Sequence, residues 1–211
     1  MTKKSFNQNI KFEKDLTSTF EPDFTYNNRP INRFDTSKKD NTQNILSKTE
    51  KLLELKKQIF SIENCNLKNN SKNLVLGNGN IDSPIMIIGE APGAEEDISG
   101  LAFQGEVGKL LKKMLSAINI DIKNIYLTYS VNFRPHEDRK PTVQEIKRYS
   151  IFLKKHISII SPKIIILMGS TAMESITGLN SKISNERGNW KEIIIKDQTY
   201  PLMITFNPSY L

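Results

Sequence analysis

Short β-rich runs alternate with helical patterns over most of this 211-residue chain, and no other feature constrains the fold as strongly. This alternation predicts parallel strands joined by crossover helices, because two parallel strands need a long connection between them. We therefore expect an α/β fold, a three-layer α/β/α sandwich with a mostly parallel central sheet. The expected strands are residues 73–76, 85–88, 124–129, 163–168 and 202–206, with an extra edge strand at 192–195.

Helices are expected between these strands. Residues 107–118 carry apolar side chains at i, i+3, i+4 and i+7, the spacing of a stripe that faces a core. Thr142 and Glu145 form a Thr-x-x-Glu capping box, which predicts the start of a long helix that continues to about residue 160. A third helix is expected to begin at Ser170, directly after the strand at 163–168.

The chain divides into three parts on composition and periodicity. Residues 1–41 have neither a 3.6 nor a 2.0 period, which predicts an irregular N-terminal extension. Because acidic and basic residues are mixed there, a loosely docked tail is favoured over a basic DNA-binding arm. Residues 42–62 are expected to form an amphipathic helix that leads into the core, and residues 63–211 the α/β domain.

Composition excludes several classes of protein. The single cysteine, Cys65, excludes an intramolecular disulfide and any four-thiolate metal site. No apolar stretch follows the basic start of the chain, and the longest apolar run, residues 164–168, is too short to span a membrane. We therefore expect a soluble, cytoplasmic protein without membrane contact. The 30 Lys and Arg residues exceed the 23 Asp and Glu residues by seven, and this net charge of +7 favours a polyanionic partner.

Four loops are candidate sites, because sheets of this kind bind ligands beyond the carboxyl ends of their strands. The loop after residue 88 combines glycines with the carboxylates of Glu90, Glu96 and Asp97, and it lacks the G-x-G-x-x-G fingerprint of dinucleotide-binding folds. The loop at 129–141 holds basic side chains beside two prolines, which suits phosphate contact. Gly169 precedes a helix whose free N–H groups can hold an anion, and the fourth loop is residues 207–210. Taken alone, each loop is equally well explained as a turn or a charged surface segment.

Taken together, the motifs resemble those of one family. In chain order they are Gly-Glu-Ala-Pro-Gly-x-x-Glu-Asp from Gly89, then Gly100 and Phe103, Arg134-Pro135, Pro141-Thr142-x-x-Glu145, Pro162 to Gly169, Arg187-Gly188 and Pro208-Ser209-Tyr210-Leu211. This order is similar to the iron–sulfur type of uracil-DNA glycosylase, often called family 4, over about residues 60–211. The resemblance implies an enzyme of base-excision repair that flips uracil out of DNA and hydrolyses its N-glycosidic bond.

The resemblance also implies roles for single residues. Phe103 matches the ring on which the flipped base stacks. Glu90 and Glu96 match carboxylates that stabilise positive charge on the sugar or orient the attacking water. The predicted catalytic residues are Glu90, Glu96 and Asn207, the predicted base-binding residues are Ala91, Phe103 and Tyr129, and the predicted DNA-binding residues are Arg134, Arg139, Lys140, Ser170, Arg187 and Ser209.

The chain departs from the family pattern at positions that matter for function. Tyr129 stands where the family has an Asn that reads the edge of uracil, and a Tyr lacks the paired donor and acceptor of an amide. Asn207 stands where the family has a His, and its amide still donates a hydrogen bond. The four cluster cysteines of the family fall on Ile62, Cys65, Phe133 and Tyr149. We therefore expect no cofactor and no metal, with a hydrophobic plug at the place of the 4Fe-4S cluster and Cys65 as a buried core residue.

Three hypotheses stay open at this point. The first is a monomeric glycosylase that excises uracil or a related deaminated base from single- or double-stranded DNA. The second is a non-catalytic nucleic-acid-binding protein of the same family, and the third is a small-nucleotide hydrolase that shares only the fold. A base-sized slot at Phe103 bordered by Glu90 and Asn207 favours catalysis, whereas a slot filled by Tyr129 favours binding alone.

Overall fold

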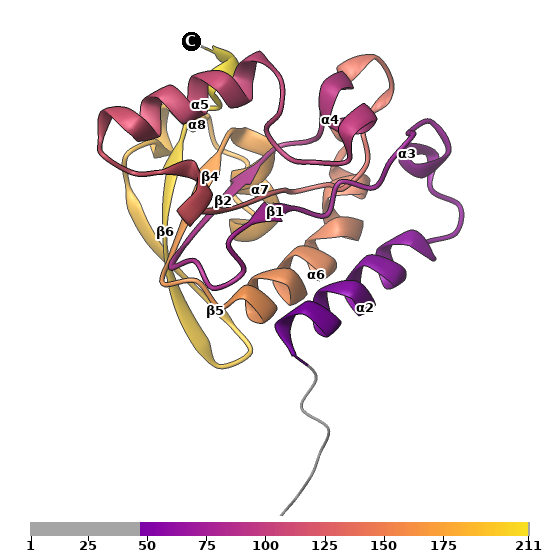
Figure 1. The fold of residues 1–211 in the computed structure, drawn as a ribbon, viewed down its shortest axis with the longest axis horizontal. Coiled ribbons are helices and arrows are strands. Elements are labelled where there is room, and N and C mark those ends of the chain that lie inside the picture. Colours follow the sequence, from indigo (N-terminus) through magenta and orange to yellow (C-terminus); the bar gives the residue numbers. More distant parts are fainter. Residues whose placement is uncertain (1–46, 211) are drawn as a thin grey trace, which may run out of the picture. The chain divides into compact units, whose positions relative to one another are not determined.

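The predicted three-layer α/β/α sandwich is confirmed in the computed structural model, which describes residues 47–210 (Figure 1). The sheet has six strands in the order β1-β3-β2-β4-β6-β5. The four central strands are parallel, and β1 and β5 pair antiparallel at the two edges. The strands are β1 (Asn78–Gly79), β2 (Ile85–Gly89), β3 (Tyr126–Tyr129), β4 (Ile164–Met168), β5 (Trp190–Ile195) and β6 (Gln198–Thr205).

Helices cover both faces of this sheet. The helices are α2 (Lys48–Phe60), α3 (Asn66–Asn69), α4 (Ala94–Ser99), α5 (Glu106–Ala117), α6 (Val143–Ile160), α7 (Ser170–Thr177) and α8 (Ile183–Glu186), and the 3-10 turns are η1 (Ile122–Asn124), η2 (His136–Asp138) and η3 (Pro208–Tyr210). Buried side chains of α6 and α7 pack on one face of the central strands, and those of α5 pack on the other. The expectations for residues 1–46 lie outside the described residues, and α2 occupies most of the rest of the predicted leading helix.

The start of α6 follows the capping box that its sequence predicts. The Thr142 hydroxyl accepts a hydrogen bond from the Glu145 N–H at 3.3 Å, and the Glu145 carboxylate accepts one from the Thr142 N–H at 2.7 Å. These two bonds satisfy N–H groups that have no partner inside the helix. The end of the loop at 129–141 is thereby fixed at the carboxyl end of the sheet.

The prediction of a strand at residues 73–76 is wrong. The Val75 N–H donates to the Asn132 carbonyl at 2.9 Å. The carbonyls of Val75 and Leu76, however, accept hydrogen bonds from side chains rather than from the backbone of a neighbouring strand. The Asn132 amide donates to the Val75 carbonyl at 3.0 Å, and the Thr128 hydroxyl donates to the Leu76 carbonyl at 2.6 Å. The ladder therefore forms two residues later, where β1 pairs with β3.

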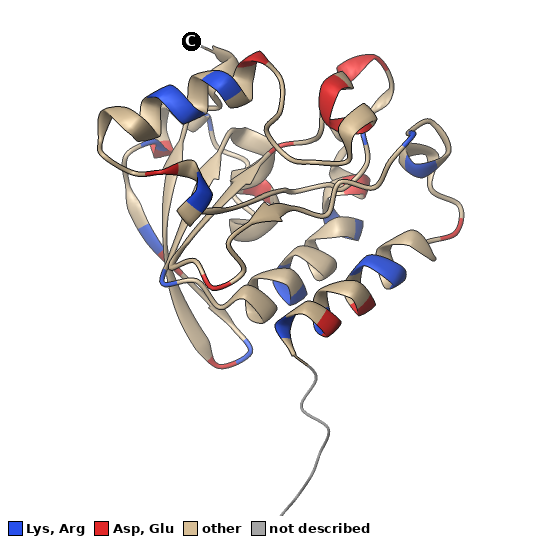
Figure 2. Cartoon of the chain, in the orientation of Figure 1, with Lys and Arg blue, Asp and Glu red and all other residues tan. Residues whose placement is uncertain are grey.

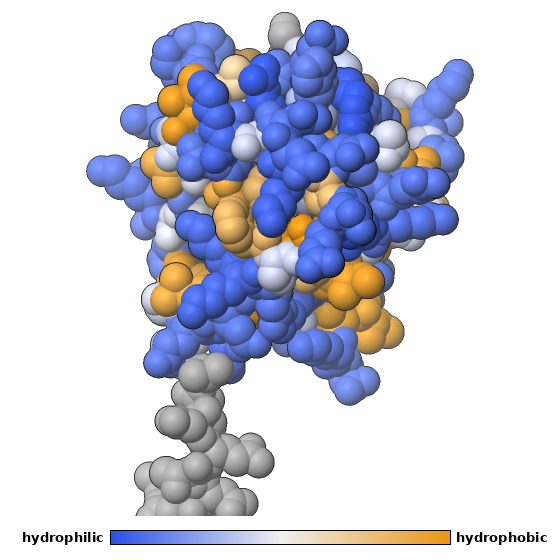
Figure 3. All heavy atoms as spheres, turned by 90° about the vertical axis from the view of Figure 1, so that its right-hand side faces the viewer, coloured by the Kyte–Doolittle hydropathy of each residue, from blue (hydrophilic) through white to orange (hydrophobic). Residues whose placement is uncertain are grey.

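The face of the molecule that carries α3 and α4 is mostly polar (Figure 3). Hydrophilic side chains cover most of this face, with smaller apolar areas between them (Figure 3). None of the helices in residues 47–210 combines the length and the apolar content that crossing a lipid bilayer requires.

Candidate active site

The carboxyl ends of β2, β3, β4 and β6 meet at one rim of the sheet, and a cavity of about 450 Å³ opens there. β3 lies on one side of β2 and β4 on the other, so the chain changes direction across the sheet at this point, where open α/β folds bind ligands. All predicted site residues line the cavity except Arg134, Ser170 and Arg187. The loops that the sequence singled out therefore converge in space.

Glu90 directly follows β2 and lies at the N-terminus of α7. One carboxylate oxygen accepts hydrogen bonds from the Thr171 N–H at 2.9 Å and the Ser170 hydroxyl at 3.3 Å. The helix dipole favours a negative charge at this end of a helix. Gly169 makes room for the carboxylate: its φ is +101°, and a Cβ at this position would lie 2.5 Å from Glu90 Cγ. The carboxylate is thus held between two strand ends.

Asn207 joins Glu90 to the last loop of the chain. Its Nδ2 donates to the second carboxylate oxygen of Glu90 at 3.2 Å, and its Oδ1 accepts from the Ser209 N–H at 3.2 Å. An amide nitrogen carries two N–H groups, so one donor remains after the bond to Glu90. The exposed phenol of Tyr210 lies at the cavity too, and the negative charge of Glu90, followed by partial burial, raises the pKa of Tyr210.

Glu96 lies in the same cavity but binds the backbone. Its carboxylate accepts hydrogen bonds from the N–H groups of Gly93 at 3.0 Å, Gln104 at 2.9 Å and Gly105 at 3.3 Å. The side chain is almost fully buried, so these amides compensate for the loss of water. Glu96 therefore fixes the conformation of the loop that carries Phe103.

Phe103 and Tyr129 stack on each other inside the cavity wall. Their ring centroids lie 4.9 Å apart with 23° between the ring planes, and the Tyr129 hydroxyl accepts a hydrogen bond from the Phe103 N–H at 3.1 Å. Phe103 is 5% exposed and Tyr129 6% exposed. Burial raises the pKa of Tyr129 far above its usual range and the charge of Glu96 adds to this, so the phenol is neutral. One face of Phe103 is thus covered by a neighbouring ring.

The basic side chains of the second loop are paired with carboxylates. Arg134 binds Asp138 through two hydrogen bonds of 2.7 and 2.8 Å, and Arg139 binds Glu145 through two of 2.9 and 2.7 Å. The arginine partners lower the pKa values of both carboxyl groups. These contacts are partly exposed, and ion pairs that solvent reaches contribute about 0 to 1 kcal/mol to stability.

Lys140 connects this loop to the Glu90 carboxylate through the Ser170 hydroxyl. Its ammonium donates to the Ser170 hydroxyl at 2.8 Å, and that hydroxyl donates to Glu90. Ser170 thus supports Glu90, although it does not line the cavity itself. Arg187 does not line it either, since its guanidinium lies over the Phe206 ring, 4.8 Å from the centroid.

Thr171 lies in the third candidate loop, whose free N–H groups were expected to hold an anion, but the sequence did not indicate that this anion is Glu90 of the same chain. Its backbone N–H binds Glu90, its side chain is fully buried, and its hydroxyl is the one buried side-chain oxygen or nitrogen within residues 47–210 that has no hydrogen-bond partner. The available signal was its place one residue into a helix that begins at a strand end.

Comparisons with known proteins identify the family of the chain. The family model of the uracil DNA glycosylase superfamily matches residues 76–211. The chain belongs to the uracil-DNA glycosylase superfamily. It is 35% identical to a type-4 uracil-DNA glycosylase of Thermotoga maritima over 77% of this chain and 84% of that protein. It is also 35% identical to type-4 enzymes of Sulfurisphaera tokodaii, over 76% and 78% of the two chains, and Archaeoglobus fulgidus, over 62% and 65%.

These relatives correct the expectation of a chain without a cofactor. They are type-4 glycosylases, the iron–sulfur class that the motifs resemble, so the relatives do not support the expected absence of a cluster. The residues at the four positions do not fit that group, however. Cys65 is buried with its sulfur 3.3 Å from the Tyr149 hydroxyl, and Phe133 packs edge-on against Tyr149. Across residues 47–210, no three His, Cys, Asp or Glu side chains gather as metal ligands do.

Proposed function

We propose that this protein is a DNA-repair glycosylase that hydrolyses the N-glycosidic bond of uracil in DNA. The observation that carries the proposal is the meeting of Glu90 and Phe103, from the connection between β2 and α5, with Asn207, from the loop after β6, in one cavity of a superfamily member. The type-4 names of the relatives support the same substrate. DNA is accordingly the proposed partner of the chain, which acts as a monomer.

The proposed reaction uses Glu90 and Asn207 at opposite ends of the breaking bond. The bond between sugar C1′ and base N1 breaks, its electron pair leaves with uracil, and a water oxygen bonds to C1′. Glu90 stabilises the positive charge that develops on the sugar and takes the proton of the water, which finally neutralises the uracil anion. The second N–H of Asn207 donates to a carbonyl of the departing base, where preorganised donors are most effective.

Phosphate contacts are assigned to the second loop and to the loops beside it. Arg134, Arg139 and Lys140 lie around the mouth of the cavity or next to it, and Ser209 offers a hydroxyl donor there, whereas the Ser170 hydroxyl donates to Glu90. Because exposed ion pairs are weak, DNA phosphates can replace Asp138 and Glu145 as the partners of the arginines.

Excision of uracil from a labelled oligonucleotide tests this proposal. With protein in excess over single-stranded or paired substrate, we expect an abasic site that alkali cleaves. Glu90→Gln keeps the shape of the side chain but removes its charge, and the single-turnover rate is expected to fall by about 10²- to 10⁴-fold. Glu95→Gln makes the same change on an exposed residue of α4 and should leave the rate unchanged. No cleavage of either substrate by the wild-type protein contradicts the proposal.

One observation favours a second candidate, nucleic-acid binding without catalysis. Tyr129 covers a face of the ring on which the base would stack, and it replaces the amide that reads uracil in the family. A binding protein of this kind gives no abasic product, and Glu90→Gln changes only its affinity for DNA. The excision assay above separates the two candidates.

A further inference from the structure

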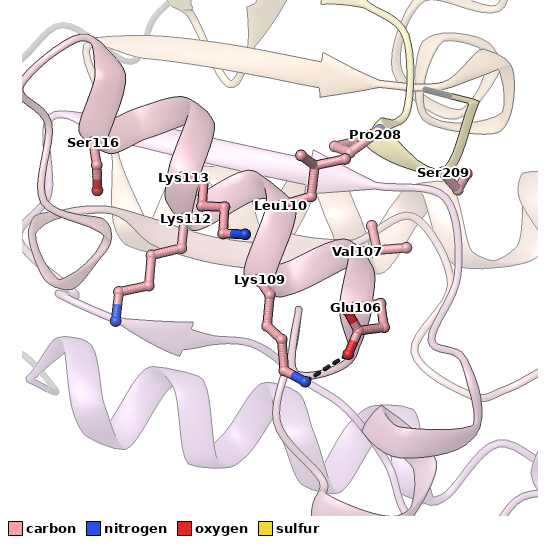
Figure 4. Close-up of a pocket in the computed structure, with 9 residues that line it drawn as sticks. All are labelled: Glu106, Val107, Lys109, Leu110, Lys112, Lys113, Ser116, Pro208 and Ser209. Carbon is pink, nitrogen blue, oxygen red and sulfur yellow. Dashed lines mark hydrogen bonds and ion pairs between the residues drawn. The ribbon is translucent and has the colours of Figure 1, made fainter.

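A second groove adjoins the candidate active site along α5. Its volume is about 840 Å³, and the residues that line it come from α5 and η3 (Figure 4). Val107 and Ser209 line both this groove and the cavity that holds Glu90. The two hollows therefore adjoin at these two residues, and a polymer held in the cavity can reach what we call the α5 groove.

The α5 groove is basic. Lys109, Lys112 and Lys113 line it, and their i, i+3 and i+4 spacing places them on one side of the helix (Figures 2 and 4). Lys109 pairs with Glu106 at 2.6 Å. Lys112 and Lys113 form no ion pair with any carboxylate of residues 47–210, unlike Arg134 and Arg139 of the second loop. Two exposed positive charges beside the cavity are thus available to an anionic partner.

The remaining lining indicates which part of a nucleic acid fits. Val107, Leu110 and Pro208 supply the apolar part, and Leu110 lies beside Pro208 (Figure 4). No aromatic ring is among the groove residues in this part of the chain, so the groove lacks the platform on which unpaired bases stack. Ammonium groups beside a small apolar surface suit the phosphates and sugars of a strand rather than its bases.

We propose that the α5 groove binds the sugar–phosphate backbone of the DNA strand next to the nucleotide held in the cavity. This inference rests on the proposed function, because it assigns the path of the same substrate. It adds Lys112 and Lys113 to the DNA contacts, and it places the flanking strand on the α5 side of the site.

The test compares two pairs of neighbouring lysines on exposed helix surfaces. Lys112→Gln/Lys113→Gln neutralises the groove, and Lys56→Gln/Lys57→Gln makes the same change on α2. Affinity is measured against salt concentration for uracil-free single strands, a trinucleotide and a strand of about 16 nucleotides. For the longer strand, we expect the groove variant to lower the slope of log K against log salt by about 1.4, since each phosphate contact contributes about 0.7. The trinucleotide should bind both variants and the wild type alike.

Two outcomes overturn the proposal: equal slopes for the two variants, or a loss of affinity for the trinucleotide as large as that for the longer strand. Excision from a second trinucleotide that carries a central uracil, measured in parallel at saturating protein, should be the same for the groove variant and the wild type. If the wild-type protein excises nothing, the proposed function fails, while the binding measurements still decide whether the groove holds DNA.

Discussion

At the scale of single residues, Tyr129 bears most directly on the proposed binding of a base. Its ring lies against Phe103, and its hydroxyl holds the backbone of the loop that carries that ring. Gly89 makes this stack possible, since a Cβ there would lie 2.7 Å from the Tyr129 ring and 2.9 Å from Phe103 Cζ. The glycine at the end of β2 therefore leaves the space that the two stacked rings occupy.

Tyr129→Asn is expected to raise the single-turnover rate of uracil excision by about 10²-fold, because it uncovers Phe103 and supplies an amide for the edge of the base. Tyr129→Phe is the control, since it keeps the stacked ring and removes only the bond to the Phe103 N–H. We expect no gain from that variant. An Asn variant that is no faster than the wild type would show that Tyr129 does not limit the reaction.

Gly169 leaves the space in which the Glu90 side chain lies. Its backbone, at φ +101° and ψ 165°, is in a region that only glycine adopts readily, and an added Cβ would meet the Glu90 side chain. We expect Gly169→Ala to lower the free energy of unfolding by about 1 to 3 kcal/mol and to reduce excision strongly. Urea denaturation and the excision assay measure the two effects.

Gly178 provides the matched control at the other end of α7. It also has a positive φ, of +71°, but a Cβ there meets no atom within 4 Å. Gly178→Ala should therefore lose about 1 kcal/mol of stability and keep the wild-type excision rate. If the two variants lose excision equally, displacement of the Glu90 side chain is not the cause of that loss.

At the scale of elements, α6 carries a buried histidine that makes its packing sensitive to pH. His156 Nε2 lies 2.9 Å from the hydroxyl of Tyr126 on β3, and burial lowers the pKa of His156 to about 3. The unfolded chain binds a proton at this residue near pH 6.5, whereas the folded chain does not until about pH 3. The free energy that neutral, buried His156 contributes to stability is therefore complete above pH 6.5. It is lost as the pH falls from 6.5 toward about 3.

Between pH 6.5 and 5, above the range of most carboxyl groups, we expect the free energy of unfolding to fall by up to about 1.4 kcal/mol per pH unit because of His156. His156→Gln should remove this slope. The other histidine, His136, is mostly exposed, and His136→Gln should leave the slope in place. Chemical denaturation at several pH values checks all three proteins, and an unchanged slope in His156→Gln contradicts the assignment.

The same scale separates what the sequence predicts from what it does not. Patterns within an element are local, so the capping box of Thr142 and the strand 85–88 were predictable. The strand at 73–76 was not, because the Thr128 and Asn132 side chains, more than fifty residues away, take the hydrogen bonds that a strand would use. Likewise, nothing local says that α4 forms within the first loop, where Glu96 binds backbone groups on both sides.

At the scale of the whole molecule, the parallel order of the strands predicts where the site lies, and the meeting of Glu90 and Asn207 follows from it. The partner that each side chain binds does not follow from the strand order. Arg134 and Arg139 were predicted to bind DNA, but their pairing with acidic neighbours depends on the path of the loop. The stack of Tyr129 on Phe103 depends on the register that sets Tyr129 opposite Gly89.

The convergence of loops from separate parallel strands also bears on how the chain acquires its chemistry. Glu90, Thr171 and Asn207 are brought together only when β2, β4 and β6 are paired in register, and the first and last of these residues are 117 positions apart. Pairings so distant along the chain form late, because closing long loops is entropically unfavourable. During refolding, we therefore expect helical content to return before the carboxylate meets the amide, and catalytic competence to be acquired among the last steps of folding.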